Sequence, residues 1–404
     1  GWMLTAPLLA PLYRSCPPVA QLGRFELLGR LALGGMSEIF LGRDPSAQPQ
    51  GREIVIKRIL PHVASDPQVR AMFMQEAKLS LLLHHPNVCS VYEFGEVDGA
   101  LYLAMEWAHG VSLRTLAARA RAWGGLPPSL GARILADVAS ALHYVHTAAD
   151  EQGRALGIIH RDVTPDNIVI CFDGQVKLLD FGIAKPTQAQ LQHTQEGVLK
   201  GKLGYISPEQ FRGDPIDARS DIFALGICMY ESLTGQPLYR RNSHYETVAA
   251  IVLDPRVPSL RRARPELPPA LDEILKRALA KDRDERYENA GLMAEELKAF
   301  ASIEKRSVRS KDLARLLRQL FPQELARGPR LDRSPAAMNS GQSWSVPTKS
   351  YIKRKDGSER ILDVSLQVKL QRRLQQRQRI GHILGSLLFF ASLTLALAAW
   401  MLRF

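Results

Sequence analysis

The sequence has few cysteines, and the four that it has lie far apart, at Cys16, Cys89, Cys171 and Cys228. No two of them have the close spacing of paired metal ligands, and together they form no disulfide framework. Cys89, Cys171 and Cys228 lie in apolar runs, where a cysteine is typically a small buried hydrophobic residue. The cysteines therefore predict neither a structural metal site nor a disulfide-stabilised secreted fold, and a reducing compartment fits best.

The chain of 404 residues also lacks a secretory signal, internal repeats and a disordered composition. Residues 1–22 are apolar, but four prolines interrupt them and no basic stretch precedes an unbroken apolar run. No unit of about 20 to 50 residues recurs along the chain. Hydrophobic residues at 46% and charged residues at 23% are ordinary for a globular protein. We interpret residues 1–24 as a flexible leader before two ordinary domains or one large two-lobed domain.

Positive charge is concentrated towards the C-terminus. The whole chain has a formal net charge of +12, and residues 301–380 alone hold 19 Lys and Arg against 7 Asp and Glu. Residues 1–300 are therefore close to neutral. Such a basic block is by default a solvated stretch, and it indicates contact with a membrane surface where a membrane segment adjoins it.

A long apolar run over residues 380–402 adjoins the basic block. It contains no Asp, Glu, Lys or Arg, and at a rise of about 1.5 Å per residue it would reach roughly 34 Å as a helix. Its faces are apolar all round, which favours a transmembrane helix over the alternative of a buried core helix. Several arginines precede the run, so the positive-inside rule keeps the N-terminal bulk in the cytoplasm. We predict a single-pass protein of the plasma membrane or the cell inner membrane.

Apolar periodicity divides the region between the leader and the basic block. From residue 25 to about residue 100, short apolar runs punctuated by Gly and Pro predict a small sheet, with one helix over residues 67–83. From residue 112 to about residue 300, helical periodicity dominates, as in residues 129–147 and 221–233. The fold class predicted is therefore α+β, with a small sheet-rich lobe before a larger, mainly helical lobe.

Leucines at the spacing of an amphipathic helix follow the second lobe, at Leu313, Leu316, Leu317 and Leu320. We expect a helical extension over residues 301–327. Residues 328–379 follow this extension. They are rich in Pro, Ser, Asn and Gly at first and then basic, which predicts a linker and a juxtamembrane segment.

Two features of the first lobe are suited to binding phosphates. Residues 30–40 predict strand, turn and strand, and at Gly34 and Gly35 backbone N–H groups can approach a phosphate closely, between Leu31 and Ile39. An ordinary hairpin explains this pattern equally well.

The second feature is Lys57, which ends an apolar strand where its ammonium could reach phosphate oxygens. Glu76, in the helix predicted over residues 67–83, is the candidate partner that would hold the lysine. Taken singly, each of the two charges is also explained as a solvated surface residue.

Three further motifs follow in order: His160-Arg161-Asp162 with Asn167 five residues after Asp162, then Asp180-Phe181-Gly182, then Ser207-Pro208-Glu209. This combination and order are similar to those of protein kinases of the bacterial Hanks type. The resemblance covers residues 25–300, about two-thirds of the chain. It implies a bilobal protein kinase fold, with an N-lobe over about residues 25–108 and a C-lobe over about residues 109–300.

The resemblance also implies roles for the motif residues. Asp162 would orient the acceptor hydroxyl and accept its proton, while Lys57, held by Glu76, would contact the phosphates of ATP. Asn167 and Asp180 would bind the magnesium ions, since both offer the oxygen ligands that Mg²⁺ prefers. In the same way, Met105 resembles the gatekeeper of the adenine pocket, and the backbone of Glu106 and Ala108 resembles the hinge that would meet the adenine.

Other residues resemble architectural positions of the family. His160 would be a packed structural histidine rather than a metal ligand. Asp221 would hold the backbone of the catalytic loop, and Glu209 with Arg286 would form a buried ion pair of the C-lobe.

The sequence departs from the family pattern at two places. In the phosphate loop, Ala32 and Ser37 stand at the outer positions where the family usually has glycine. The second departure involves a pair of positions that meet beside the catalytic Asp in the family. Where serine/threonine kinases have Lys two residues after the catalytic Asp this chain has Thr164, and where they have Thr before the substrate loop it has Lys202. We hypothesise that the two residues are exchanged and that Lys202 supplies the ammonium to the transferring phosphate. An exposed loop charge is the alternative interpretation of Lys202.

Arg161 precedes the catalytic Asp, as in kinases whose activation segment is ordered when a phosphorylated residue pairs with that arginine. Thr194 and Thr187 are the candidate regulatory sites between residues 183 and 206.

These features predict a membrane-tethered protein kinase that uses ATP and Mg²⁺, acts on Ser and Thr of protein substrates, and autophosphorylates through self-association. Serine/threonine specificity is favoured because the catalytic loop lacks the Ala-Ala-Arg insertion of tyrosine kinases. The alternative is a pseudokinase scaffold, which the altered phosphate loop and Thr164 favour. Nucleic-acid binding is not predicted, because the basic tail borders the apolar run and lacks interleaved aromatic residues.

Overall fold

The computed structural model describes residues 17–47, 51–97, 99–180, 203–254, 256, 258–302, 308–334, 350–353 and 359–362. The chain divides into two units, Gly1–Trp344 and Ser345–Phe404, and each is described by itself. Lys202, Thr187, Thr194 and the apolar run at residues 380–402 lie outside the described residues. None of the helices in the described part of the chain has both the length and the apolar character needed to cross a membrane.

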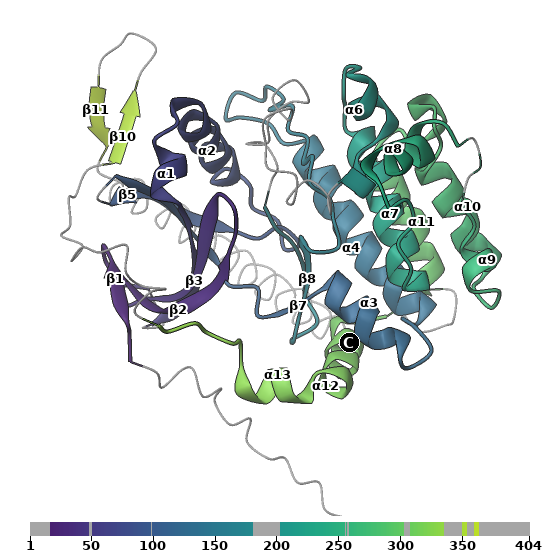
Figure 1. Cartoon of the computed structure of the whole chain (residues 1–404), viewed down its shortest axis with the longest axis horizontal. Coiled ribbons are helices and arrows are strands. Elements are labelled where there is room, and N and C mark those ends of the chain that lie inside the picture. Colours follow the sequence, from purple (N-terminus) through teal and green to yellow (C-terminus); the bar gives the residue numbers. More distant parts are fainter. Residues whose placement is uncertain are drawn as a thin grey trace, which may run out of the picture. The chain divides into compact units, whose positions relative to one another are not determined.

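The first lobe is a six-stranded antiparallel sheet in the order β1-β2-β3-β4-β6-β5 (Figure 1). Its strands are β1 (Ala20–Leu22), β2 (Phe25–Leu33), β3 (Ser37–Asp44), β4 (Arg52–Ile59), β5 (Val91–Val97) and β6 (Ala100–Glu106). The helices α1 (Pro61–Ala64) and α2 (Pro67–Ser80) lie between β4 and β5. The helix predicted over residues 67–83 is therefore confirmed, although it ends at Ser80. Pro67 opens it, and the Asp66 carboxylate caps it by accepting from the Gln68 N–H at 2.8 Å.

Alternation along β4 decides which side chains face α2. Successive strand residues point to opposite faces of a sheet. Val55 packs with Phe73 and Ala77 of α2, whereas Ile54 and Ile56 join a separate cluster on the other face. Lys57 continues the Val55 series, so its side chain lies on the α2 side.

The second lobe is mainly helical. Its helices are α3 (Leu113–Arg121), α4 (Pro128–His146), η4 (Leu203–Tyr205), α6 (Pro208–Arg212), α7 (Arg219–Thr234), α8 (His244–Val252), α9 (Leu260–Ala263), α10 (Pro269–Ala278), η5 (Arg283–Glu285) and α11 (Ala290–Ser302). The helices predicted over residues 129–147 and 221–233 are confirmed as α4 and α7. Both are buried over most of their length, because apolar residues lie on nearly every side of each.

A small antiparallel sheet in the order β7-β8-β9 completes this lobe. Its strands are β7 (Gly110–Ser112), β8 (Ile168–Cys171) and β9 (Val176–Leu178). Because β8 follows Asn167 directly and β9 ends two residues before Asp180, this hairpin holds two of the predicted site residues at neighbouring strand ends.

Among the described residues, the helices α12 (Ser310–Leu320) and α13 (Pro322–Arg327) follow α11. The amphipathic helix predicted from the leucine spacing is confirmed as α12, with Leu313, Leu317 and Leu320 buried in the core of the helical lobe.

The second unit contains a hairpin of β10 (Ser350–Lys353) and β11 (Glu359–Leu362), in which Ser350 lies opposite Leu362. The linker composition did not predict these strands. Tyr351, Ile352 and Ile361 favour strand pairing, and the surrounding basic charge conceals that preference.

Candidate active site

Lys57 joins the two lobes at the centre of the candidate site. Its Nζ lies 3.7 Å from the Glu76 carboxylate on α2 and 3.0 Å from the carboxylate of Asp180, which follows β9 by two residues. The register of β3 and β4 places Ile39 opposite Lys57, so the far end of the predicted phosphate loop lies beside this lysine. The structure thus brings together three residues that lie far apart in the sequence.

The carboxylates keep the lysine charged. Burial alone would lower the pKa of Lys57, but the negative charges of Asp180 and Glu76 raise it above its ordinary value. The side chain of Lys57 is 15% exposed and that of Glu76 is 7% exposed, whereas that of Asp180 is 36% exposed. The ammonium is therefore held in place, with Asp180 on the side that solvent and a ligand can reach.

Asp162, Asn167 and Asp180 are connected through the backbone. The Asn167 Nδ2 donates to the Asp162 carbonyl at 2.9 Å, and the Leu179 N–H donates to the Asn167 carbonyl at 2.8 Å. Asp180 follows Leu179 directly, so these bonds hold the three residues close together. Thr164 is buried in the same loop, and its carbonyl accepts from the Asn167 N–H at 3.0 Å.

Asp221 at the start of α7 holds the backbone of this loop. Its carboxylate accepts from the N–H groups of His160 at 2.7 Å and of Arg161 at 2.9 Å. Burial would raise the pKa of Asp221, but its hydrogen bond with His146 and the bonds from the loop lower it. His160 is fully buried, and its Nε2 lies 3.0 Å from the Leu179 carbonyl, which fits the structural role that the sequence suggests.

Two residues of the site have unusual backbone conformations. Among the described residues, Arg161 at φ 62° and Asp180 at φ 43° are the non-glycine residues with positive φ. Such conformations cost roughly 1–3 kcal/mol each and persist where the surroundings impose them. The bonds from Asp221 to the loop and from Lys57 to Asp180 supply that constraint here.

The predicted hinge leaves the sheet at the end of β6. Met105 is buried in the cluster under α2, while the Glu106 N–H donates to the Ser90 carbonyl at 2.8 Å. Ala108 follows in the segment that leads to β7. These residues lie between the two lobes, as an adenine-binding segment would.

The predicted phosphate loop joins β2 and β3. Leu31 lies near the end of β2, and Gly34 donates to the Ser37 carbonyl at 2.8 Å across the turn that includes Gly35. The turn is tight, because a Cβ on Gly34 would lie 3.3 Å from that carbonyl. The hairpin is thus present, and its position beside Lys57 favours the phosphate-binding interpretation over that of an ordinary hairpin.

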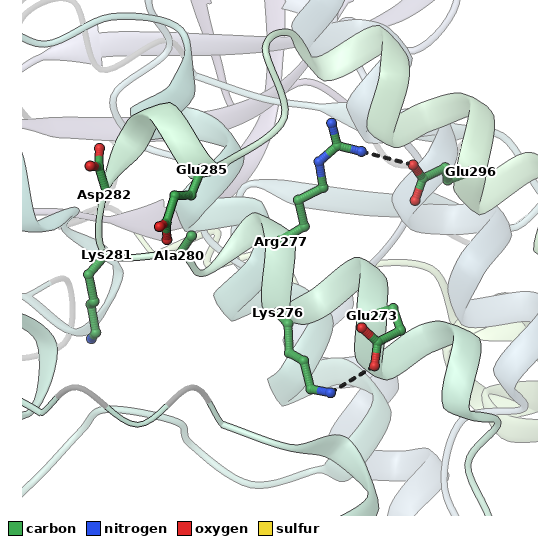
Figure 2. Close-up of a pocket in the computed structure, with 8 residues that line it drawn as sticks. All are labelled: Glu273, Lys276, Arg277, Ala280, Lys281, Asp282, Glu285 and Glu296. Atoms are coloured by element: carbon green, nitrogen blue, oxygen red, sulfur yellow. Dashed lines mark hydrogen bonds and ion pairs between the residues drawn. The ribbon is translucent and has the colours of Figure 1, made fainter.

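A charged groove on the helical lobe is a less suitable site. It is lined by residues of α10, η5 and α11 (Figure 2). Two of its cations are paired internally, Lys276 with Glu273 at 2.7 Å and Arg277 with Glu296 at 3.2 Å. None of the catalytic or binding residues predicted from the sequence lines it.

Comparison with known proteins shows the family to which these residues belong. Residues 25–298 match the protein kinase domain family. The chain belongs to the protein kinase family. The prediction of a bilobal kinase fold is confirmed by this match and by the solved structures.

Several kinases resemble the chain over this region. It is 40% identical over 289 residues to the tyrosine-protein kinase MasK of Myxococcus xanthus. The matched region covers 71% of this chain and 44% of MasK. It is 37% identical over 280 residues to the serine/threonine-protein kinase PknB of Mycobacterium tuberculosis, covering 68% of this chain and 42% of PknB. The crystal structure of the Mycobacterium tuberculosis PknI kinase domain matches 69% of this chain and 97% of that domain, with 27% identity and a TM-score of 0.52. The chain thus spans less than half the length of MasK or PknB.

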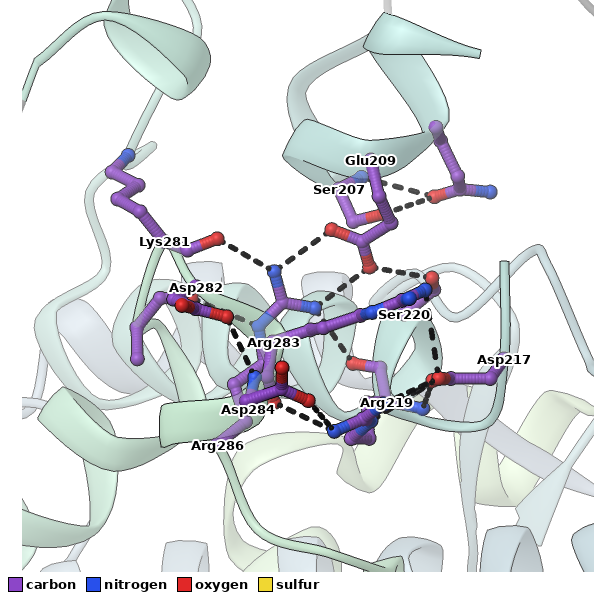
Figure 3. A network of polar contacts seen from close by, with 12 residues as sticks. Ser207, Glu209, Asp217, Arg219, Ser220, Lys281, Asp282, Arg283, Asp284 and Arg286 are labelled. Carbon is purple, nitrogen blue, oxygen red and sulfur yellow. Dashed lines mark hydrogen bonds and ion pairs between the residues drawn. The ribbon is translucent and has the colours of Figure 1, made fainter. Parts of the chain in front are cut away.

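A buried ion pair stabilises the C-lobe of this kinase (Figure 3). The Arg286 guanidinium makes two bonds to the Glu209 carboxylate, at 2.7 and 2.8 Å, and the Ser220 hydroxyl donates to the same carboxylate at 2.6 Å. Burial would raise the pKa of Glu209, but Arg286 lowers it to about 2. Removing one partner would leave a buried charge, at a cost of about 3–5 kcal/mol.

The donor set of the kinase site fits magnesium. The Nδ2 of Asn167 is used in the bond to Asp162, so the amide oxygen is the atom left to coordinate a metal ion. Asp180 adds a partly exposed carboxylate. Mg²⁺ prefers such oxygen ligands and commonly combines one or two carboxylates with phosphate oxygens of the substrate.

Two supporting residues were not found from the sequence. The Lys177 ammonium on β9 lies 2.7 Å from the Glu106 carboxylate, which ties the hinge to the strand that leads to Asp180. The His146 Nε2 lies 2.8 Å from the Asp221 carboxylate. A lysine inside the apolar strand at residues 176–178 was an available signal, because a buried ammonium needs a partner. The sequence around His146 carries no comparable signal.

Proposed function

We propose that this chain is a protein kinase that transfers the γ-phosphate of ATP to a hydroxyl group of a protein, with Mg²⁺ as cofactor. The observation that carries the proposal is the position of the Lys57 ammonium, between Glu76 of the N-lobe and Asp180 of the C-lobe. The ammonium and the metal-binding carboxylate would then act on one triphosphate, next to Asp162.

The chain's own residues would carry the transfer as follows. Asp162 orients the acceptor hydroxyl and accepts its proton as the new bond to the γ-phosphorus forms and the bond to the ADP oxygen breaks. Lys57 contacts the α- and β-phosphates, and the backbone of Glu106 and Ala108 binds adenine. Magnesium held by Asn167 and Asp180 would neutralise phosphate charge when bound.

Serine and threonine are the acceptors that we propose first. The PknB relatives are named serine/threonine kinases, and the catalytic loop lacks the Ala-Ala-Arg insertion. Tyrosine is the second candidate, because MasK is named a tyrosine-protein kinase. The two acceptors are distinguished by the phosphoamino acids that the enzyme produces.

Phosphate transfer tests the proposal directly. We expect the wild-type chain with Mg²⁺ and γ-labelled ATP to label itself and a generic protein acceptor, with phosphoserine and phosphothreonine as the products. Asp162→Asn should lower kcat by about 10² or more, since it removes the base that orients the hydroxyl. Asp173→Asn is the matched control, because Asp173 lies in the exposed β8–β9 turn of the same lobe.

Equal transfer by wild type and Asp162→Asn would reject this mechanism. A wild-type chain that folds but transfers no phosphate would instead favour a pseudokinase scaffold. Phosphotyrosine as the main product would change the acceptor and leave the mechanism in place.

We also propose that residues 380–402 anchor the kinase in the plasma membrane or inner membrane, with the kinase domain in the cytoplasm. The support is the uncharged apolar run and the arginines before it. Concentration on an anionic bilayer would favour encounters between copies and so autophosphorylation between them, for which Thr194 and Thr187 are the candidate sites.

A further inference from the structure

The segment that follows the kinase domain returns to the N-lobe. Residues 308–334 lie beyond the family match, which ends at residue 298. In Figure 1 this green segment passes from α12 beside the helical lobe, through α13, to the edge of the sheet at β1 and β2. We call residues 308–334 the strap.

One end of the strap is attached firmly to the C-lobe. Phe321 is fully buried, and the Arg119 guanidinium of α3 lies 4.6 Å from its ring while donating to the Leu320 carbonyl at 2.8 Å. Arg119 also pairs with Glu324 of α13 at 2.9 Å. The α12 backbone approaches the β8–β9 turn so closely that a Cβ on Gly174 would overlap the Ser310 carbonyl.

The other end pairs with β2 immediately before the phosphate loop. Arg30 and Asp332 exchange two backbone hydrogen bonds, each 2.9 Å long, in an antiparallel bridge. Leu331 packs with Leu28 and Leu41 in a small cluster that also includes Leu31 and Trp107. The strap backbone lies so close to β2 that a Cβ on Gly29 would come within 2.7 Å of the Leu331 Cβ.

A chain of charges continues from the strap across the base of the loop. The Asp332 carboxylate pairs with Arg30 at 2.8 Å, Arg30 with Glu38 at 3.0 Å, and Glu38 with Arg58 at 2.6 Å. Glu38 and Arg58 are buried, so their pairing constrains geometry more than an exposed pair would. Arg58 follows Lys57 on β4. The strap therefore contacts Arg30 at the start of the loop directly, and it is linked to Glu38 near the end of the loop through Arg30.

We propose that the strap positions the phosphate-binding loop over the nucleotide, with Leu331 and Asp332 as positioning residues. The inference rests on the proposed function, because the ligand is Mg-ATP. Holding β2 in its binding geometry removes part of the ordering cost that the loop would otherwise incur on binding. Loss of the strap contact should then weaken ATP binding more than it slows the chemical step.

The test compares two strap variants of the full-length chain with wild type. Leu331→Ala removes the apolar contact, and Asp332→Pro removes the N–H that donates to Arg30. Arg330→Ala is the control, since Arg330 is an exposed residue of the same segment. The dissociation constant of Mg-ATP, the KM for ATP, kcat and the melting temperature are measured for each protein, together with hydrogen exchange at the Arg30 amide.

We expect both variants to raise the dissociation constant and the KM for ATP by about fivefold or more, with kcat changed by less than about twofold. Exchange at the Arg30 amide should accelerate, and Arg330→Ala should resemble wild type. A lower melting temperature with an unchanged KM for ATP in both variants would mean that the strap only stabilises the fold. That result would overturn the inference, while the proposed kinase function would stand. A wild-type chain that neither binds Mg-ATP nor transfers phosphate would overturn both.

Discussion

The charge of Lys57 depends on residues from two other elements. Burial alone would lower the pKa of this lysine, and the carboxylates of Asp180 and Glu76 more than offset that effect. Replacing either carboxylate would therefore lower the pKa of Lys57 and leave its ammonium less well oriented. This dependence explains why the lysine within β4 becomes informative only when its neighbours are known.

Single residues differ in how well the sequence predicts them. Asp162, Asn167 and Asp180 are recognisable because phosphate transfer requires their side-chain types in a fixed order. Lys177 and His146 act through contacts with Glu106 and Asp221, which are distant in sequence. Nothing in their local pattern specifies those partners, so only the folded structure identifies them.

The hypothesis that Thr164 and Lys202 are exchanged gives a prediction at this scale. If Lys202 supplies the ammonium to the transferring phosphate, Lys202→Ala should lower kcat by about 10² while Thr164→Ala costs less. Steady-state kinetics with a protein acceptor measure both. The double variant Thr164→Lys with Lys202→Thr restores the usual family arrangement and should be more active than Lys202→Thr alone. Near-normal kcat in Lys202→Ala would refute the exchange.

Among the elements, long periodic segments are predicted best. The helices α2, α4, α7 and α12 were all predicted from the sequence, and each of them is present. Boundaries differ by a few residues, because the cap geometry depends on individual residues such as Asp66 and Pro67. The pairing of residue 332 with β2 was not predicted, since a single bridge leaves no periodic pattern and the composition there indicates a linker.

The apolar segment at residues 380–402 gives a prediction at the scale of an element. Deleting residues 380–404 should move the protein from the membrane fraction to the soluble fraction and slow autophosphorylation, because copies would no longer be concentrated on one surface. Cell fractionation and phosphate labelling measure the two effects. An unrelated transmembrane helix in place of this segment should restore both. Unchanged localisation and labelling in the deletion variant would contradict the membrane proposal.

At the scale of the kinase domain, the site lies between two hydrophobic clusters, one in each lobe. The sheet cluster around Val55 and Phe73 holds Lys57 and Glu76, while the large helical core holds the catalytic loop through Asp221. The sequence predicts both lobes and the residues that each contributes. It does not predict the distances between those residues, because these depend on how the lobes pack and on the segments, such as the strap, that join them.

The central claim is that one cation of the N-lobe and one carboxylate of the C-lobe act on the same nucleotide. A double-mutant cycle with Lys57→Met and Asp180→Asn tests it most directly. The quantity measured for wild type, the two single variants and the double variant is the dissociation constant of Mg-ATP. We predict that the two substitutions are strongly non-additive, with a coupling of about 1 kcal/mol or more, because each disturbs the group that positions the other. Independent, additive effects on Mg-ATP binding, or no effect of either substitution, would contradict the claim.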